Sequence, residues 1–263
     1  MTANGETPCV ARRDEGGVAT LTLDRGERFN PLSAPMIAGL EARLDEVAAD
    51  RTVKAVVLAG AGRGFCAGHD LKEMRAHSAD RAWQRGLFTD CSRMMVKITQ
   101  LPQPVIARVH GIATAAGAQL VSMCDLAVAA EEARFALPGV NIGLFCSTPA
   151  VGVARNVGRK RAMELLLTGE LFDARTALAW GLVNRVVPQA ALDAEVKRFT
   201  DVIVARSPRV IAAGKRAFYR QVDQTLGAAY ETTGEVMASG MLEADAAEGI
   251  DAFLAKRAPR WAE

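Results

Sequence analysis

Short, almost wholly apolar segments separated by helical patterns constrain the fold of this sequence more than any other feature. They lie at residues 54–59 (KAVVLA), 105–109 (VIARV) and 126–129 (LAVA), and a last one follows at 183–187. The near-continuous apolar character of the first is typical of a parallel strand that is covered on both faces. Because short strands alternate with helices, the sequence predicts an α/β core.

Flanking patterns complete the expected element order. Residues 18–23 (VATLTL) alternate apolar and polar positions after the turn Gly16-Gly17, which predicts a β-hairpin. A helix is expected from Ser33 to Asp50, because apolar residues recur there at helical spacing. Beyond the last strand the chain is helical, with patterns at 192–206, 208–221, 225–240 and 245–257. The sequence therefore predicts one α/β core with an appended helical layer.

Charge and cysteine usage exclude several classes of protein. The 263 residues include 32 basic and 30 acidic side chains, so a nucleic-acid or acidic-membrane partner is not indicated. The five cysteines are far apart, without metal-ligand spacing or a disulfide framework: Cys9, Cys66, Cys91, Cys124 and Cys146. No signal core or membrane-spanning run is present. We therefore expect a cytoplasmic protein without a metal, a nucleic-acid partner or a membrane partner.

The segment that follows the strand at 105–109 is the first candidate site. Small residues at 113–117 open a predicted helix, whose first turn presents unpaired N–H groups to an anionic oxygen. A second glycine-rich loop, at 60–74, does not fit the dinucleotide-binding fingerprint, because Phe65 takes the place of the third glycine. The sequence thus predicts an anion site and disfavours nicotinamide binding.

Several longer motifs together resemble one protein family. They are LDRGERFNPLS (23–33), GFCAGHDLKEM (64–74), PVIARVHGIATAAGAQL (104–120), CDLAVAAEEARFALP (124–138), GRKRAMELLLTGELFDARTALAWGLVNRVVP (158–188) and, more weakly, EGIDAFLAKR (248–257). In this order they are similar to the crotonase (enoyl-CoA hydratase/isomerase) superfamily over nearly the whole chain. The resemblance implies a spiral of ββα units at residues 1–200, and a C-terminal helical trimerisation region at 201–263. It also implies a homotrimer, or a hexamer built as a dimer of trimers.

The resemblance further implies an acyl-CoA thioester as the ligand, with no separate cofactor. Its thioester oxygen would be held by the backbone N–H groups of His69 and Ala116, with Gly117 as the alternative one residue on. The positions that match the family's CoA contacts are Arg28, Ala67, His69, Asp70, Leu71, Met237 and Lys256. Asp125, in the CDLAVAA motif, is interpreted as a structural carboxylate.

Both glutamates that the family's hydratases use for acid/base chemistry are replaced. The matching positions are Gln119 and Gly139, which carry no ionisable side chain. Ordinary hydration is therefore expected to be weak or absent. The segments PGVNIGLFCSTP and GIATAAGAQL resemble the enoyl-CoA hydratase domain-containing protein 3 subgroup, which shares both replacements.

Three possibilities remain open for what the protein does without these glutamates. A bicarbonate ion in the room left by Gly139 could act as the base, or His69 or Cys146 could act as the base or nucleophile. The third is a non-catalytic protein of the same fold that binds acyl-CoA or has an assembly role. The leading expectation is an acyl-CoA lyase or isomerase of unassigned reaction that stabilises an enolate.

Overall fold

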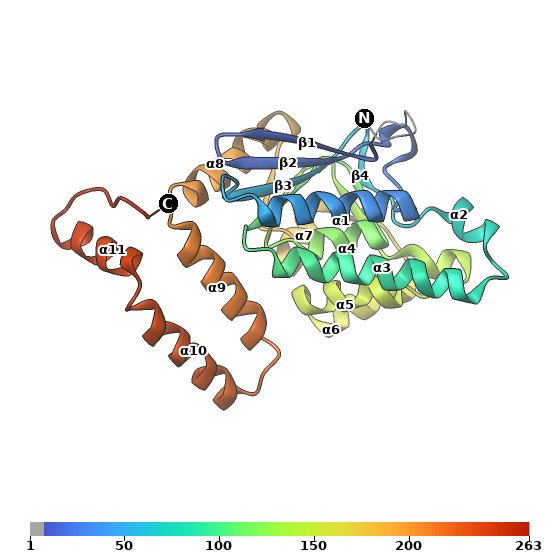
Figure 1. Cartoon of the computed structure of the whole chain (residues 1–263). Helices are drawn as coiled ribbons and strands as arrows, with labels where there is room; N and C mark the ends of the chain where they lie inside the picture. Colours follow the sequence, from blue (N-terminus) through green and yellow to red (C-terminus); the bar gives the residue numbers. More distant parts are fainter. Residues whose placement is uncertain (1–7, 263) are drawn as a thin grey trace.

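A computed structural model describes residues 8–262 of the chain, and its largest element is a six-stranded sheet (Figure 1). The strand order is β1-β2-β3-β5-β7-β10. The strands are β1 (Val10–Glu15), β2 (Val18–Leu23), β3 (Ala55–Gly60), β5 (Val105–Val109), β7 (Leu126–Ala130) and β10 (Arg185–Val187). The β1–β2 hairpin is antiparallel and every other pair is parallel, as the sequence predicts for strands joined by helices.

A second, smaller sheet lies in segments where the sequence indicated no strand. Residues 113–114, which were expected to open a helix, belong to one of its strands, and the helix begins at Ala116. The order of this sheet is β4-β6-β8-β9, with strands β4 (Gly64–Cys66), β6 (Ile112–Thr114), β8 (Arg134–Ala136) and β9 (Phe172–Asp173). The first three strands are parallel. Strands of two or three residues are too short to show a period of two, so the sequence did not predict them. Their parallel course brings three carboxyl ends to the same edge.

The two sheets are built by a repeating ββα unit, which is the arrangement that the resemblance implies. Each unit adds one strand to each sheet. In the first two units, β3 and β4 precede α2 (Leu71–Ala76), and β5 and β6 precede α4 (Ala116–Met123). Strands β7 and β8 lead into the 3-10 helix η2 (Pro138–Ile142). The expected spiral of ββα units is therefore confirmed.

The helices begin and end at the residues that favour such ends. Ser33 caps α1, because its hydroxyl accepts a hydrogen bond from the Met36 N–H at 3.3 Å. Asp173 caps α7 in the same way, and Gly181 ends it with φ 88°. The remaining core helices are α1 (Ala34–Ala49), α3 (Arg81–Gln100), α5 (Ser147–Asn156), α6 (Arg159–Thr168), α7 (Ala174–Trp180) and α8 (Leu192–Val204), with short 3-10 turns η1 (Gly26–Arg28) and η3 (Gln189–Ala191).

Apolar side chains cover both faces of the central strands. On one face a large cluster joins the sheet to α1, α3 and α4, and includes Leu58, Phe65 and Met94. On the other face Val57 and Ile106 pack with Leu192 of α8. Burial on two faces explains why these strands read as continuous apolar runs instead of alternating.

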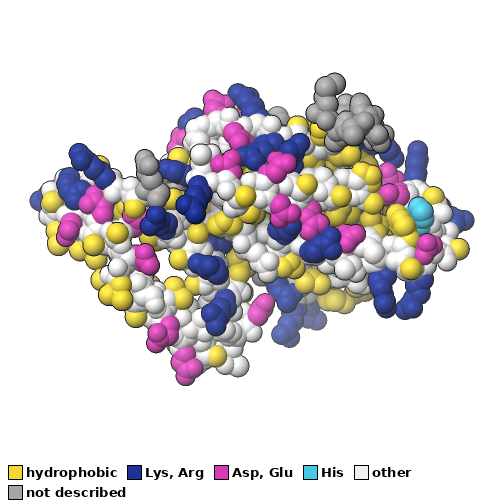
Figure 2. Space-filling model, viewed as in Figure 1, with side chains coloured by type: hydrophobic (Ala, Val, Ile, Leu, Met, Phe, Trp, Pro, Cys, Tyr) yellow, Lys and Arg dark blue, Asp and Glu magenta, His cyan; other side chains and the backbone are white. Residues whose placement is uncertain are grey.

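The last helices form an arm that extends away from the core (Figure 1). It consists of α9 (Pro208–Gln221), α10 (Leu226–Gly240) and α11 (Ala244–Leu254), and α10 has no buried residue. Large apolar side chains are exposed along α10 and α11 and gather on this arm in Figure 2: Leu226, Tyr230, Met237, Met241, Leu242, Phe253 and Leu254. The division predicted between residues 200 and 201 falls within α8.

A buried ion pair fastens the arm to the core. The Lys215 ammonium of α9 lies 2.7 Å from the Asp125 carboxylate and also donates to the carbonyls of Ile98 and Gln103. Asp125 accepts a hydrogen bond from the Val105 N–H at the start of β5, at 2.7 Å. A cavity of about 350 Å³ lies beside this pair, under α9. Asp125 thus makes the structural contacts that the sequence indicated.

Candidate functional site

The predicted site residues gather where the parallel strands of the small sheet end. β4 leads into residues 67–70, β6 into 115–119 and β8 into 137–139. The Thr114 hydroxyl donates to the Ala67 carbonyl at 3.1 Å, which ties the first two segments together. In open α/β sheets, ligands bind outside the carboxyl ends of the strands, so this edge is the candidate site.

Gly68 holds the two candidate N–H donors close to each other. Its φ is +95°, and a Cβ placed on it would lie 3.3 Å from the Ala116 nitrogen and 2.9 Å from the Ala115 Cβ. The next residue in the chain is His69. Within residues 8–262, no protein group accepts a hydrogen bond from the N–H of His69 or Ala116. Two backbone donors without partners therefore lie on adjoining loops.

The turn before α4 is held in an unusual backbone conformation. Ala115 has φ 50° and ψ −119°, a region that favours glycine, while its N–H is bonded to the Ala136 carbonyl at 2.9 Å. Such a residue costs about 1–3 kcal/mol unless its surroundings enforce it. The conformation sets the direction in which the first N–H groups of α4 point.

Replacing Ala115 by glycine is therefore expected to stabilise the protein. Relief of the backbone strain exceeds the added freedom of the unfolded chain, and we expect a gain of about 1 kcal/mol in the free energy of unfolding. Urea titration measures it. The control is Ala118→Gly, inside α4, which should lose about 1 kcal/mol or more. A loss of stability in Ala115→Gly would contradict the strain argument.

Gln119, at one of the expected glutamate positions, is in the first turns of α4. Its side chain is buried, with a relative exposure of 4%, and its Oε1 has no hydrogen-bond partner among the described residues. The structure thus places a neutral amide beside the candidate donors. An amide cannot accept a proton near neutral pH, so it cannot perform the glutamate's acid/base step.

The space beside Gly139, the other expected glutamate position, is already filled. A Cβ built on Gly139 would lie 2.7 Å from the Leu144 carbonyl oxygen and 2.9 Å from the Cys146 Sγ. A side chain on residue 139 would therefore clash with the chain itself. A bicarbonate ion acting as the base near Gly139 stays a prediction. Burial raises the pKa of the Cys146 thiol, which keeps it protonated and disfavours it as a nucleophile.

The His69 ring is packed and neutral. It contacts the Phe88 ring edge-on at 5.2 Å, and its buried Nε2 has no hydrogen-bond partner among residues 8–262. Burial lowers the pKa of His69 to about 4. Its side chain is therefore unprotonated at neutral pH but has little driving force to accept a proton.

The shifted pKa of His69 predicts a loss of stability in acid. The unfolded chain binds this proton near the ordinary histidine pKa of 6.5 and the folded chain only near pH 4, so stability falls as pH drops from about 6.5 to about 4. The contribution is about 3 kcal/mol at most. Urea midpoints measured between pH 7 and 4 should fall less steeply for His69→Gln than for wild type. Parallel profiles would contradict the assignment.

Two predicted CoA contacts are engaged with each other. The Asp70 carboxylate caps α2 by accepting from the N–H groups of Lys72 and Glu73, and it lies 2.8 Å from the Arg28 guanidinium. Arg28, Ala67 and Leu71 are exposed and form the rim of the site. The structure shows a folding role for the Asp70 side chain, and CoA contacts on this rim stay a prediction.

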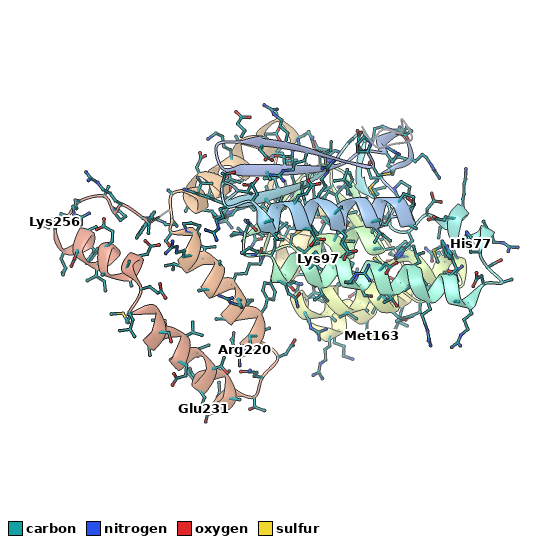
Figure 3. All side chains as sticks on the ribbon, in the orientation of Figure 1. His77, Lys97, Met163, Arg220, Glu231 and Lys256 are labelled. Atoms are coloured by element: carbon teal, nitrogen blue, oxygen red, sulfur yellow. The ribbon has the colours of Figure 1, made fainter. Side chains whose placement is uncertain are left out.

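The two C-terminal candidates lie far from this rim within one chain. Figure 3 places Lys256 at the opposite end of the molecule from His77, which directly follows α2. Met237, on α10, is 68% exposed on the projecting arm. The structure therefore does not bring Met237 or Lys256 to the site of the same chain.

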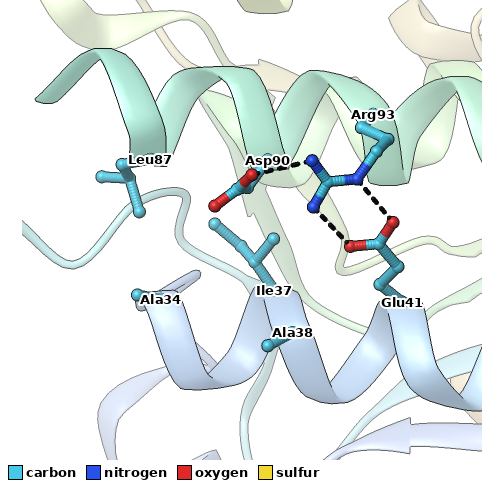
Figure 4. A pocket seen from close by; sticks show the side chains of 7 residues that line it. All are labelled: Ala34, Ile37, Ala38, Glu41, Leu87, Asp90 and Arg93. Carbon is cyan, nitrogen blue, oxygen red and sulfur yellow. Dashed lines mark hydrogen bonds and ion pairs between the residues drawn. The ribbon is translucent and has the colours of Figure 1, made fainter. Parts of the chain in front are cut away.

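Other features of the described residues do not add a site. A cavity of about 50 Å³ between α1 and α3 is lined in part by the ion pair between Glu41 and Arg93 (Figure 4). Among residues 8–262, no three acidic, histidine or cysteine side chains are grouped to hold a metal ion. No helix in that range is long and apolar enough to cross a membrane.

Sequence reasoning missed two contacts that shape the site. Asn30 is fully buried, and its amide donates to the Gly64 and Phe65 carbonyls at 2.9 and 3.1 Å, which fastens β4 in place. A Cβ on Gly117 would lie only 2.0 Å from the Cys66 carbonyl oxygen. Asn30 and Gly117 both lie in motifs that the sequence analysis identified. The sequence does not report which carbonyl groups they contact.

Comparison with known proteins finds one matching family and several similar proteins. The family described as Enoyl-CoA hydratase/isomerase matches residues 13–263. The enoyl-CoA hydratase domain-containing protein 3 of Xenopus laevis is 42% identical, over 97% of this chain and 86% of its own. The crystal structure of the human protein of that name has a TM-score of 0.93 at 42% identity, covering 96% of this chain and all (100%) of the other.

A bacterial structure is also similar. A crystal structure titled as an enoyl-CoA hydratase of Mycobacterium smegmatis has a TM-score of 0.95 at 53% identity, and covers 97% of this chain and 99% of its own. The vertebrate relatives carry the word mitochondrial in their names. That finding overturns the cytoplasmic location expected from the sequence, because the cysteine pattern that led to it does not distinguish between compartments.

Proposed function

Because the chain belongs to the enoyl-CoA hydratase/isomerase (crotonase) family, we propose that it binds an acyl-CoA thioester at the joined ends of β4 and β6. The backbone N–H groups of His69 and Ala116 hold the thioester oxygen and stabilise it as an enolate. The observation that carries this proposal is the close approach of Gly68 to the Ala116 nitrogen, with both donors lacking a partner in the described chain. Each preorganised donor contributes about 3 kcal/mol to an enolate-like oxygen.

A matched pair of ligands tests the oxygen contact directly. Butyryl-CoA carries the thioester carbonyl, whereas the thioether S-butyl-CoA has the same length without that oxygen. We expect calorimetry to show that butyryl-CoA binds at least about tenfold more tightly than S-butyl-CoA, because only the thioester engages both donors. Equal affinities would refute the proposed oxygen site, and binding of neither ligand would refute the function.

A binding role without turnover is the second candidate, and the lack of an ionisable side chain at Gln119 and Gly139 favours it. Neither Gln119 nor the Cys146 thiol is suited to move a proton, and the His69 Nε2 is buried. The two candidates differ in one observable. Enolate formation exchanges the α-protons of butyryl-CoA for deuterium in D₂O, which mass spectrometry detects. Binding with no exchange supports the non-catalytic role, and exchange supports the lyase or isomerase role.

We also propose a homotrimer, or a hexamer of two trimers, assembled through the arm. The exposed apolar side chains on α10 and α11 favour contact with another copy, since large apolar patches are typical of interfaces. A neighbouring copy would also bring Met237 and Lys256 to a site that they cannot reach within their own chain. Analytical ultracentrifugation tests the assembly, and a monomer at micromolar concentration would refute it.

A further inference from the structure

Two buried polar atoms at the candidate site have no partner in the described chain: the Gln119 Oε1 and the His69 Nε2. Such an atom costs stability until a donor or acceptor reaches it, so native proteins rarely leave one without a role. Gln119 belongs to α4. His69 directly follows Gly68, which lies close to the first residue of α4. Both atoms therefore belong to the site already described and not to a distant part of the core.

The geometry of α4 directs the Gln119 amide toward the same place. Ala116 is the first residue of α4 and Gln119 is the fourth. Side chains in an α-helix lean toward its N-terminus, so the amide covers the turn that presents the Ala116 N–H. The His69 ring comes from the other loop, beside Phe88. The carbons next to a thioester bound there would lie against both side chains.

The chemistry of these two groups indicates what they would recognise. An amide both donates and accepts hydrogen bonds, and an unprotonated imidazole does the same through its two nitrogens. Neither carries charge at neutral pH, so they suit a neutral oxygen better than a carboxylate. A purely hydrocarbon acyl chain would leave both groups without a partner. Sites with such buried polar groups bind ligands that lack the matching oxygen less tightly.

Building on the proposed function, we propose that the protein selects acyl-CoA thioesters whose acyl chain carries a hydroxyl or carbonyl oxygen near the thioester. Gln119 and His69 recognise that oxygen through neutral hydrogen bonds. Gln119 then acts as a specificity-determining residue at a position where the family's hydratases carry a catalytic glutamate.

The binding test compares ligands that differ in one oxygen. Wild type is titrated with butyryl-CoA, 3-hydroxybutyryl-CoA and acetoacetyl-CoA by calorimetry. We expect at least one oxygenated ligand to bind about tenfold or more tightly than butyryl-CoA, the range for satisfying a buried polar group. In Gln119→Met, which has a similar shape but no amide, this ratio should fall toward one.

The free protein supplies a second readout. Because Gln119→Met removes an unpartnered buried amide without removing volume, its melting temperature should rise by about 2–4 °C at fixed protein concentration. The control is Gln103→Met. Gln103 is also buried with an unpartnered Oε1, but its Nε2 donates to the Val47 carbonyl at 2.9 Å, away from the site. That variant should melt lower and keep the wild-type ligand ratio.

The outcomes separate this inference from the function on which it rests. Equal binding of butyryl-CoA and both oxygenated ligands to wild type overturns the inference and leaves acyl-CoA binding intact. An oxygen preference that persists in Gln119→Met overturns the role of Gln119. Failure of every thioester to bind overturns both the inference and the proposed function. A lower melting temperature for Gln119→Met would show that its amide is satisfied in the free protein, and would also overturn the inference.

Discussion

We expect the purified protein to hydrate crotonyl-CoA at least about 10⁴-fold more slowly than a family member that carries both glutamates. General acid–base catalysis contributes about 10²–10⁴-fold for each positioned group, and both positions lack an ionisable side chain. The substitutes available nearby do not compensate. The His69 pKa is lowered to about 4, and the pKa of the Cys146 thiol is raised by burial.

Loss of enoyl-thioester absorbance measures the rate, with a two-glutamate hydratase as the positive control. Putting the carboxylates back should not restore activity. In Gln119→Glu with Gly139→Glu, the second side chain must displace the Leu144 carbonyl and the Cys146 Sγ, which lie 2.7 and 2.9 Å from its Cβ. Wild-type hydration within tenfold of the positive control would show that another group supplies the chemistry.

Gly117→Ala should prevent stable folding or cost more than about 4 kcal/mol in the free energy of unfolding. The added methyl group would lie 2.0 Å from the Cys66 carbonyl oxygen. A methyl group is fixed to the backbone and the carbonyl is part of it, so neither can rotate away. Losses of this size are exceptional for a single substitution and are tied to overpacking or strain. The clash would separate β4 from α4 and remove the close approach of the two donor loops.

Gly214→Ala is the matched control, because its added Cβ meets nothing within 4 Å on the exposed side of α9. It should be neutral or stabilising by about 0.5–1 kcal/mol, since alanine favours the helix. Circular dichroism with urea titration compares the two variants. Equal stability of Gly117→Ala and wild type would show that the loops can separate without cost, contrary to the proposed donor geometry.

Much of the fold could be predicted from the sequence, because long elements have clear patterns and clear ends. Helix α9 spans the expected residues 208–221, since Ser207 caps it and Pro208 fits its first turn. Strands β4, β6 and β8 could not be predicted, because each has only three residues and pairs with partners far away in the chain. Periodicity carries no information at that length.

The site was predictable as a set of segments but not as an arrangement. The motifs identified residues 67–71 and 115–119, and the structure brings them together at one sheet edge. That Cys146 fills the space beside Gly139 depends on how residues 137–146 fold back, which no local pattern reports. The roles assigned to the individual site residues remain predictions that the experiments above test.

Strand β5 connects the residue that anchors the arm to the segment that leads into the candidate site. Its first residue, Val105, is bonded to Asp125, which holds Lys215 of the arm; its far end continues through β6 into the turn before α4. The five residues span only about 16 Å, and a strand paired on both sides stretches little. The contact that holds α9 and the turn that precedes α4 therefore lie at opposite ends of one continuous β5–β6 segment.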